Sequence, residues 1–570
     1  MLESVQSLRS SNGPSSGLAD ERRLRWLAWL SGVVCVLVRL PFVSHRLWDH
    51  DSVQFALGVE HYDLAAHHPH PPGYPLYIAL LKVLAACGLE PVTAMVLVTL
   101  VASALGAACM PLLVRALLAP DGAGAEAGEA PGAAVFGTAL FAAALFVFNP
   151  LLWFYGELPL LYGVEGGLTV VLAWGAARMV DGRWALVRAA LLLALAGGLR
   201  PSSLVLLAPL VAFGLWRAWR HGAAKGPWPW LAAGLGGLAV LVWALPLFHY
   251  AGGYRAWKAI NDEHFRTLLP ATSVLYGAGF GALRHNLLLL AKWAAQGLFP
   301  TAVALLALPL VQMLDQVPPK WREVPPKWRR LVQPFGDRAG FLLAWAAPAI
   351  AFFALFHITK AGYTLVHLPA PLVGCALVAT PWLGTARRGA LAAVVAALVG
   401  GAIYLAGPDR LPGEPAWQVP WRHEFHGRLV RAFDTEIDAL RDVLARQDPA
   451  ASTLVTVELE GGGDGGAAGF LYSWHRHLQW YAPEFTVVAL VPDERFALVT
   501  RGHAPFRRVD TEVPLPAGVS RLVFVLAAEP DLRFPVPPGE DLFTGPHFHV
   551  RAIPLPEDGR LGSFRFVPDR

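Results

Sequence analysis

The chain has 570 residues, of which 55% are hydrophobic and only 15% charged, and its formal net charge is +4. One soluble core could not hide so much apolar surface, so the composition predicts an integral membrane protein. Lys and Arg form short clusters between apolar runs, which fits inner-side loops and argues against nucleic-acid binding. The four Cys residues lie in or beside apolar runs and lack CxxC spacing, so neither a disulfide framework nor a zinc site is indicated.

The first apolar run follows a charged N-terminal stretch. We predict a cytoplasmic tail at residues 1–25 and a signal-anchor span near 26–42, because no small-residue cleavage site precedes the next polar stretch. A polar loop at residues 44–74 comes next. The apolar run Tyr74–Cys87 is shorter than the ~20 residues that a spanning helix needs, so we predict that it does not cross. Further spans are predicted near Val92–Leu117, Ala133–Pro150, Val164–Val180, Trp230–Phe248, Leu287–Leu310, Phe341–His357, Leu365–Leu383 and Leu391–Leu405.

Residues 184–220 contain two short apolar stretches joined at Arg200 and Pro201, which we interpret as a pair of half-helices that enters the membrane and returns. With this count, the basic clusters at 178–188, 217–225, 317–330 and 387–388 all lie inside, as the positive-inside rule requires. The loop 44–74 then lies outside with Glu157 and residues 249–285 and 357–367. If Tyr74–Cys87 did cross, the later loops would have to be recounted.

From Gly407 onward the sequence is polar and rich in turns. Residues 425–446 have helical spacing, and 452–459, 485–490 and 520–527 are typical of strands. The predicted fold is an all-α polytopic membrane protein with about 10–12 transmembrane or half-spanning helices and a small C-terminal α/β domain. The predicted divisions are the tail 1–25, the membrane domain 26–406 with its first outer loop 44–74, and an extracytoplasmic domain 407–570.

The first outer loop, "WDHDSVQFALGVEHYDLAAHHPHPPGYPLY", is unusually rich in ionisable residues. Asp49, Asp51 and Glu60 could mark a site, because clustered ionisable groups at a membrane face usually belong to a pathway or site. A helix cap explains the Asp and Ser residues equally well. The "HHPH" block could bind a divalent metal, although Pro69 breaks the helical spacing of zinc motifs. The prolines before Gly73 stiffen the loop.

Four further residues stand at the same predicted face. Arg200 would be costly at a break in a membrane helix unless it met water, an acid or an anion, although it could also snorkel to the interface. Glu157 could equally be an interfacial acid beside aromatic residues. Lys360 and Tyr363 are open to the same two interpretations. The convergence of these regions on one face is the stronger signal.

The motif "DSVQFALGV…HPHPPGYPLY" resembles membrane glycosyltransferases of the GT-C class, in particular a group whose first loop reads Asp-Ser-Gly-Glu and then His-Pro-Pro-Gly-Tyr-Pro. Protein O-mannosyltransferases and aminoarabinose transferases are more distantly similar. Asp51 and Ser52 occupy the acidic motif, whereas Gln54 stands where the group has Glu. The stretch around Glu157 resembles the group's second acidic loop, and "GLRPSS" resembles a junction that presents a basic residue to the lipid phosphate.

The resemblance implies an inverting transferase that moves a sugar from a polyprenyl-phosphate donor to an acceptor outside the membrane. It makes Asp51 the candidate general base and Arg200 the candidate partner of the leaving phosphate. It also implies a multi-pass protein of a bacterial cell membrane with its catalytic face outside. Supporting acids are expected among Asp49, Glu60 and Glu157, and donor or substrate contacts at His68, His70, Tyr74, Arg200, Lys360 and Tyr363.

Two other classes of protein fit part of the pattern. A transporter or flippase also uses broken helices with buried charge, but such carriers often have two similar halves, and only the short "VPPKWR" element is repeated here. A polysaccharide polymerase or ligase of the cell envelope differs mainly in its donor and acceptor. The sequence leaves the sugar, the acceptor and any metal requirement open.

Overall fold

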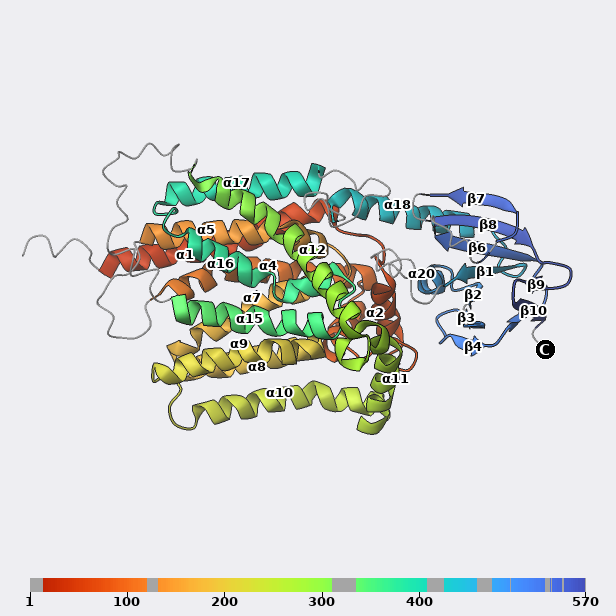
Figure 1. Cartoon of the computed structure of the whole chain (residues 1–570), viewed down its shortest axis with the longest axis horizontal. Coiled ribbons are helices and arrows are strands. Elements are labelled where there is room, and N and C mark those ends of the chain that lie inside the picture. The colour runs from red at the N-terminus through yellow and green to blue at the C-terminus, as the bar shows by residue number, and fades with distance from the viewer. Residues whose placement is uncertain are drawn as a thin grey trace, which may run out of the picture.

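A bundle of long helices is followed along the chain by a β-rich domain that sits against one end of the bundle, as Figure 1 shows. We call this end of the bundle, which contacts the C-terminal domain, the domain end. The computed structural model describes residues 14–119, 132–309, 335–406, 425–458, 474–492, 494–527, 534, 536–545 and 548–568. The basic cluster at 317–330 lies outside the described residues.

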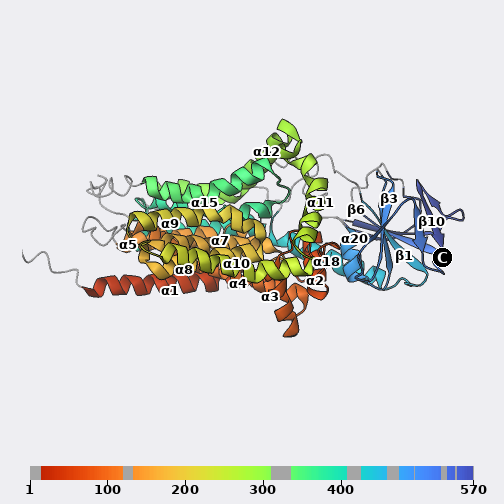
Figure 2. The same ribbon diagram turned by 90° about the horizontal axis from the view of Figure 1, so that it is seen from below.

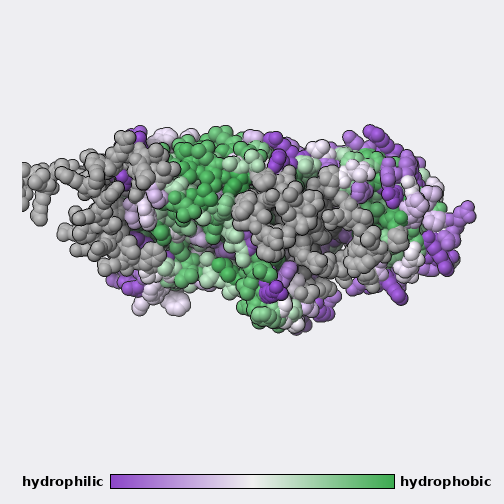
Figure 3. All heavy atoms as spheres, turned by 45° about the horizontal axis from the view of Figure 1, so that its top comes forward, coloured by the Kyte–Doolittle hydropathy of each residue, from purple (hydrophilic) through white to green (hydrophobic). Residues whose placement is uncertain are grey.

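The long helices run side by side along the bundle. Seven helices of the described residues are long and apolar enough to cross a membrane, and between 28% and 56% of their most apolar windows is buried. The remaining surface is apolar, and Figure 3 shows hydrophobic residues around the middle of the bundle and hydrophilic ones on the C-terminal domain. The predicted polytopic membrane fold is confirmed. The bundle helices are α1 (Pro14–Arg39), α4 (Pro91–Leu118), α5 (Gly132–Val147), α7 (Leu161–Ala177), α8 (Arg183–Leu199), α9 (Pro201–Arg220), α10 (Trp228–Tyr250), α12 (Gly279–Leu306), α15 (Phe335–Leu355), α16 (Pro369–Ala379) and α17 (Ala386–Ala406).

Short helices cover the domain end. In Figure 2, α11 runs across the bundle axis at this end. Many helices here begin at a proline, whose fixed φ and missing N–H suit the first helical turn; α3, α4, α6 and α9 are examples. The elements outside the main bundle are α2 (His50–Glu60), α3 (Pro75–Ala86), α6 (Pro150–Tyr155), α11 (Tyr254–Thr272) and the 3₁₀ turns η1 (Leu40–Phe42), η2 (Arg178–Asp181), η3 (Val274–Tyr276) and η5 (Ala361–Val366).

The helix breaks differ in part from those predicted. The helix α3 has only 12 residues, ~18 Å at the usual rise, which agrees with a segment that does not cross. The half-helix prediction at Arg200 is wrong, because α8 has 17 residues and α9 has 20 and counts among the candidate spans. The two helices are full elements of the bundle, with Arg200 in extended conformation between them. The predicted span at Leu365–Leu383 is a 3₁₀ turn followed by the 11-residue α16.

Glycine allows a close helix crossing behind the site. A Cβ on Gly167 of α7 would lie 2.0 Å from the carbonyl oxygen of Ala102, and one on Gly106 of α4 would lie 2.7 Å from the Cα of Gly167. Only a residue without a side chain lets the two backbones approach so closely. This contact fixes the position of α7, which carries Glu165 two residues earlier.

The C-terminal domain is built on a mixed sheet of seven strands in the order β4-β3-β2-β1-β6-β8-β7. The central strand β1 pairs in parallel with both β2 and β6, and the outer strands are antiparallel. A second sheet has the order β5-β10-β9. The helix and three strands predicted here are all present. The elements are α18 (Gly427–Leu444), α20 (Trp474–Tyr481), β1 (Ser452–Val457), β2 (Thr486–Val491), β3 (Phe496–Arg501), β4 (Arg507–Val509), β5 (Glu512–Leu515), β6 (Arg521–Ala527), β7 (Glu540–Thr544), β8 (Phe548–Pro554), β9 (Arg560–Leu561) and β10 (Phe564–Pro568).

Candidate active site

The centre of the site is a lysine held between two aspartates. Lys360 Nζ lies 2.7 Å from Asp49 Oδ2 and 2.6 Å from Asp51 Oδ2. The aspartates stand at the start of α2, while Lys360 directly precedes η5. All three side chains are nearly buried, with 11% of Lys360 and 12% or less of each aspartate exposed. The ion pairs therefore join two segments that are about three hundred residues apart in the chain.

Asp49 is both a helix cap and an ion-pair partner of Lys360. Its Oδ1 accepts a hydrogen bond from the Ser52 N–H at 3.1 Å, and the Ser52 hydroxyl lies 3.0 Å from the Asp49 N–H, which completes a capping box. On a helix, side chains two residues apart diverge. Asp49 and Asp51 nevertheless meet because Asp49 is the extended N-cap and only Asp51 belongs to the first turn. The predicted helix cap is therefore present, and the same side chain also contacts Lys360.

Asp51 is surrounded by groups that favour its charged form. His50 Nε2 lies 3.1 Å from Asp51 Oδ1, and the Tyr162 hydroxyl donates to Asp51 Oδ2 at 3.3 Å. Burial favours the neutral acid, but Lys360 and the nearby His50 outweigh it and hold the pKa of Asp51 well below its ordinary value. The negative charges of Asp49 and Asp51 raise the pKa of Lys360 despite its burial. The pair is therefore ionised at neutral pH.

His70 and Tyr74 form a second contact line to Asp51. The Tyr74 hydroxyl lies 2.6 Å from His70 Nε2, and His70 Nδ1 lies 3.8 Å from Asp51 Oδ1. Burial lowers the pKa of His70 to about 3, with the charge of Asp51 opposing the shift, so the imidazole is neutral. Tyr74 has a left-handed backbone with φ of 50°, which is strained for a residue with a side chain. This conformation occurs where the loop turns into α3.

Arg200 forms a second charged group beside the first. Its Nη1 donates to Glu165 Oε2 at 2.6 Å, and the Ser203 hydroxyl donates to Glu165 Oε1 at 2.5 Å. The Arg200 guanidinium carbon lies 5.3 Å from the ring centre of Tyr162 and 5.1 Å from that of Tyr363. Arg200 does not snorkel to a free surface, because only 13% of its side chain is exposed.

Tyr162 connects the two charged groups. Its hydroxyl contacts Asp51, and its ring faces Arg200 and stands edge-on to Tyr363, with 5.4 Å between the ring centres. Gly362 makes this arrangement possible, since a Cβ there would lie 2.4 Å from the Tyr162 ring. The site thus combines the carboxylates of Asp49, Asp51 and Glu165 with two cations, Lys360 and Arg200, beside the rings of Tyr162 and Tyr363 at the domain end.

Three predicted site residues lie apart from this group. Glu60, at the end of α2, pairs with His503 of the C-terminal domain. His68 Nε2 lies 3.3 Å from Arg476 Nη1, also of that domain. Glu157 is buried behind the site and accepts a hydrogen bond from the Tyr404 hydroxyl. Burial raises the pKa of Glu157 well above its ordinary value, although nearby Arg39 and Arg431 oppose this.

Four contact residues were not among the predicted site residues, namely His50, Tyr162, Glu165 and Ser203. Glu165 had a usable signal, because it is an acid inside the apolar run predicted at Val164–Val180, and such residues face a bundle interior or a partner. His50 lies between the two aspartates. Ser203 and Tyr162 carry no comparable local signal.

The described ranges contain no group of three or more His, Cys, Asp or Glu side chains placed to hold a metal ion. Within those ranges His68 contacts Arg476, and His70 contacts Tyr74. The divalent-metal hypothesis for the "HHPH" block stays a prediction. Charge compensation at the site comes from Lys360 and Arg200.

This chain matches one family model and is similar to solved structures. Crystal structures of ArnT from Cupriavidus metallidurans, bound to undecaprenyl phosphate and in the apo state, are each 13% identical to this chain and have TM-scores of 0.47 and 0.43. They cover 92% and 91% of this chain and 97% and 96% of their own. No curated protein matches. Residues 62–222 match the family model described as "Protein O-mannosyl-transferase TMEM260 N-terminal domain", which confirms the predicted resemblance to O-mannosyltransferase-like membrane proteins over that part of the chain.

Proposed function

We propose that this protein is a GT-C type membrane glycosyltransferase that transfers a sugar, with inversion, from a polyprenyl-phosphate donor to an acceptor hydroxyl outside the membrane. The observation that carries the proposal is the position of Asp51, in contact with Lys360 and Tyr162, with Arg200 against the other side of the Tyr162 ring at the domain end. Such a site holds both a base for the acceptor and cations for a phosphate leaving group.

The chemistry assigns one role to each charge. As the acceptor oxygen attacks the anomeric carbon, Asp51 takes the hydroxyl proton and the new glycosidic bond forms. The bond between that carbon and the phosphate oxygen breaks at the same time, and its electron pair leaves with the phosphate. Arg200 and Lys360 then offset the negative charge that develops on the phosphate. One face of the sugar is attacked while the other loses phosphate, so the configuration inverts.

The position of the site supports a lipid-linked donor. The domain end lies where the long apolar helices stop, so a polyprenyl chain could remain in the bilayer while its phosphate reaches Arg200. The basic loops around 178–188 and 217–225 lie at the opposite end of the bundle, which supports an outer location for the site. The name of the matched family makes a mannosyl group and a protein hydroxyl the first donor and acceptor to test.

The decisive experiment supplies purified protein with a panel of radiolabelled polyprenyl-phosphate sugars and follows transfer or slow hydrolysis. Wild-type protein should consume one of them, and Asp51→Asn should not. A transporter would move the lipid between leaflets of a vesicle without breaking the sugar–phosphate bond. Intact donor with every sugar, in protein that still binds lipid phosphate, would refute the proposal.

A further inference from the structure

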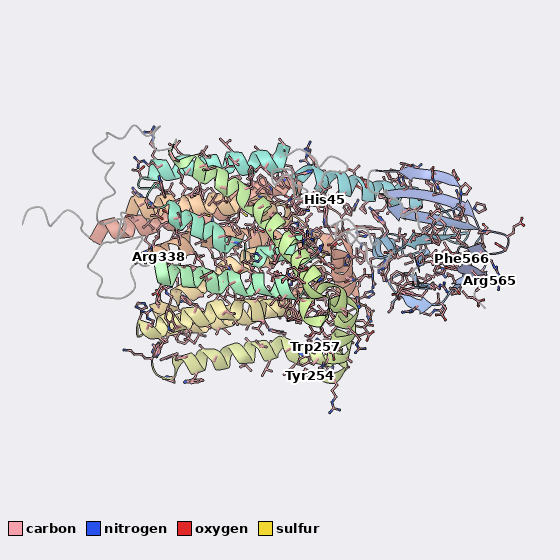
Figure 4. The ribbon with its side chains drawn as sticks, viewed as in Figure 1. His45, Tyr254, Trp257, Arg338, Arg565 and Phe566 are labelled. Carbon is pink, nitrogen blue, oxygen red and sulfur yellow. The ribbon has the colours of Figure 1, made fainter. Side chains whose placement is uncertain are left out.

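The C-terminal domain forms hydrogen bonds with residues 44–47, which precede the candidate base Asp51. The Ser44 hydroxyl and the His45 N–H each donate to Asp434 of α18 at 2.8 Å. Arg46 Nε donates to Asp438 of the same helix at 2.7 Å. Figure 4 shows His45 where the bundle meets the domain. Three consecutive residues before α2 are thus bound by one helix of the domain.

The next residue, Leu47, has both backbone polar groups bound by α20. Its N–H donates to the Tyr481 hydroxyl at 2.7 Å, and its carbonyl oxygen lies 3.2 Å from His477 Nε2. Leu47 is fully buried and stands two residues before Asp49. Side chains of another domain therefore take the place that a strand partner would occupy for this backbone.

The C-terminal domain also contacts the part of the loop that follows α2. Arg476 of α20 lies 3.3 Å from His68 Nε2 through Nη1 and 3.4 Å from the Ala66 carbonyl oxygen through Nη2. His503 pairs with Glu60 at the end of α2 and stacks on Trp480. The domain consequently contacts the loop before α2, at its end and after it.

We propose that the C-terminal domain acts as a template for the first outer loop, with Tyr481 and Asp434 as positioning residues that set the path of residues 44–51. An 11-residue helix such as α2 is marginal in isolation, so its position has to come from tertiary contacts. The Ser44 N–H donates to the Glu157 carbonyl oxygen of the bundle, and Asp49 is joined to α2 by its capping box. Between these two anchors, residues 45–47 are bound by side chains of α18 and α20. The catalytic meaning of this template rests on the function proposed above, because it concerns the placement of Asp51 against Lys360.

Hydrogen exchange tests the template without any activity assay. Tyr481→Phe leaves the Leu47 N–H without its acceptor, and Asp434→Ala releases Ser44 and His45. Each variant should speed amide exchange in residues 44–60 by roughly 5- to 100-fold. A buried donor that loses its acceptor destabilises the local structure, and the segment then opens more often. Exchange in the central strands β1 and β6 should stay unchanged and so report an intact domain.

Two control variants match these changes. Tyr77→Phe makes the same chemical change beside Phe55 of α2, where the Tyr77 hydroxyl has no hydrogen-bond partner among the described residues. Asp442→Ala removes an exposed acid from α18. Both should exchange like the wild type. Wild-type exchange in Tyr481→Phe and Asp434→Ala as well would overturn the template.

Kinetics then test positioning. Loss of the template should lower kcat roughly 10-fold or more while the KM for the donor changes little, because misplacing a base weakens the chemical step more than donor binding. Faster exchange with a wild-type kcat would refute the positioning role. Absence of any sugar transfer by the wild type would instead count against the proposed function, and the exchange result would stand by itself.

Discussion

The two aspartates on Lys360 have separable roles at the scale of single residues. Asp49 uses one oxygen to cap α2, and asparagine caps helices about as well as aspartate. Asp51 makes no cap and is the acid nearest His50, His70 and Tyr162. A substitution of carboxylate by amide should therefore distinguish a structural acid from a base.

We expect Asp51→Asn to lower kcat by ~10²- to 10⁴-fold, the usual cost of removing a positioned general base. Asp49→Asn and Glu60→Gln should cost much less, since one remains a good cap and the other sits at the domain interface. Donor binding by Asp51→Asn should stay near normal, measured by equilibrium binding of the labelled lipid. If Asp51→Asn turned over at a near-normal rate while Asp49→Asn or Glu60→Gln was slow, the general base would be another acid and not Asp51.

Arg200 allows a second prediction at this scale. Arg200→Lys should retain more activity than Arg200→Ala, because lysine keeps the charge but loses the planar fork that suits phosphate oxygens and aromatic stacking. Glu165→Gln should resemble Arg200→Lys, since it weakens the contact that orients the guanidinium. Transfer rates of the three purified variants provide the measurement. Equal and near-normal rates for both Arg200 variants would leave Arg200 without a role in the reaction.

At the scale of elements, η5 brings Lys360 to α2 and controls the ionisation of Asp51. Lys360→Met removes the largest opposing charge and leaves burial, so the pKa of Asp51 should rise from its lowered value. As the pH falls, Asp51 then becomes protonated at a higher pH than in the wild type. The acid limb of the kcat/KM profile should therefore shift to higher pH. Measurements between about pH 4 and pH 8 would detect this, because the ordinary pKa of Asp is ~3.9. An unchanged acid limb would show that Lys360 does not set the ionisation of the base.

Hydrophobic runs predicted most of the elements, and local signals explain which ones. Residues 92–117 and 230–248 are long enough to leave little choice, and both are helices close to the predicted bounds. Near Arg200 the prediction was wrong because apolar length alone underestimates helices that begin with charged or small residues. The meeting of Lys360 with Asp51 could be predicted only as a shared face. No local pattern states which outer loops touch, since tertiary packing decides this.

At the scale of the whole molecule, the C-terminal domain binds a loop that lies far before it in the sequence. The loop 44–74 follows the first helix, yet it is hydrogen-bonded by α18 and α20, which come after the last helix of the bundle. Folding of the site therefore requires contacts between residues separated by about four hundred positions in sequence. Sequence patterns predicted the loop and the domain separately, while the interface between them comes from the structure.

Topology provides the last prediction, and the native Cys87 is a ready reporter for it. Cys87 is exposed at the end of α3, whose 12 residues are too few to cross. If the loop and the C-terminal domain share the outer side, a membrane-impermeant thiol reagent should label Cys87 in intact cells.

In a Cys87→Ser background the same reagent should also label Ala65→Cys in the loop and Ser520→Cys in the domain, both at exposed positions. Lys225→Cys, in the basic loop at the opposite end, should react only after the cells are opened. Labelling of Ala65→Cys without Ser520→Cys would break the shared side, and labelling of Lys225→Cys in intact cells would invert the orientation that the basic loops predict.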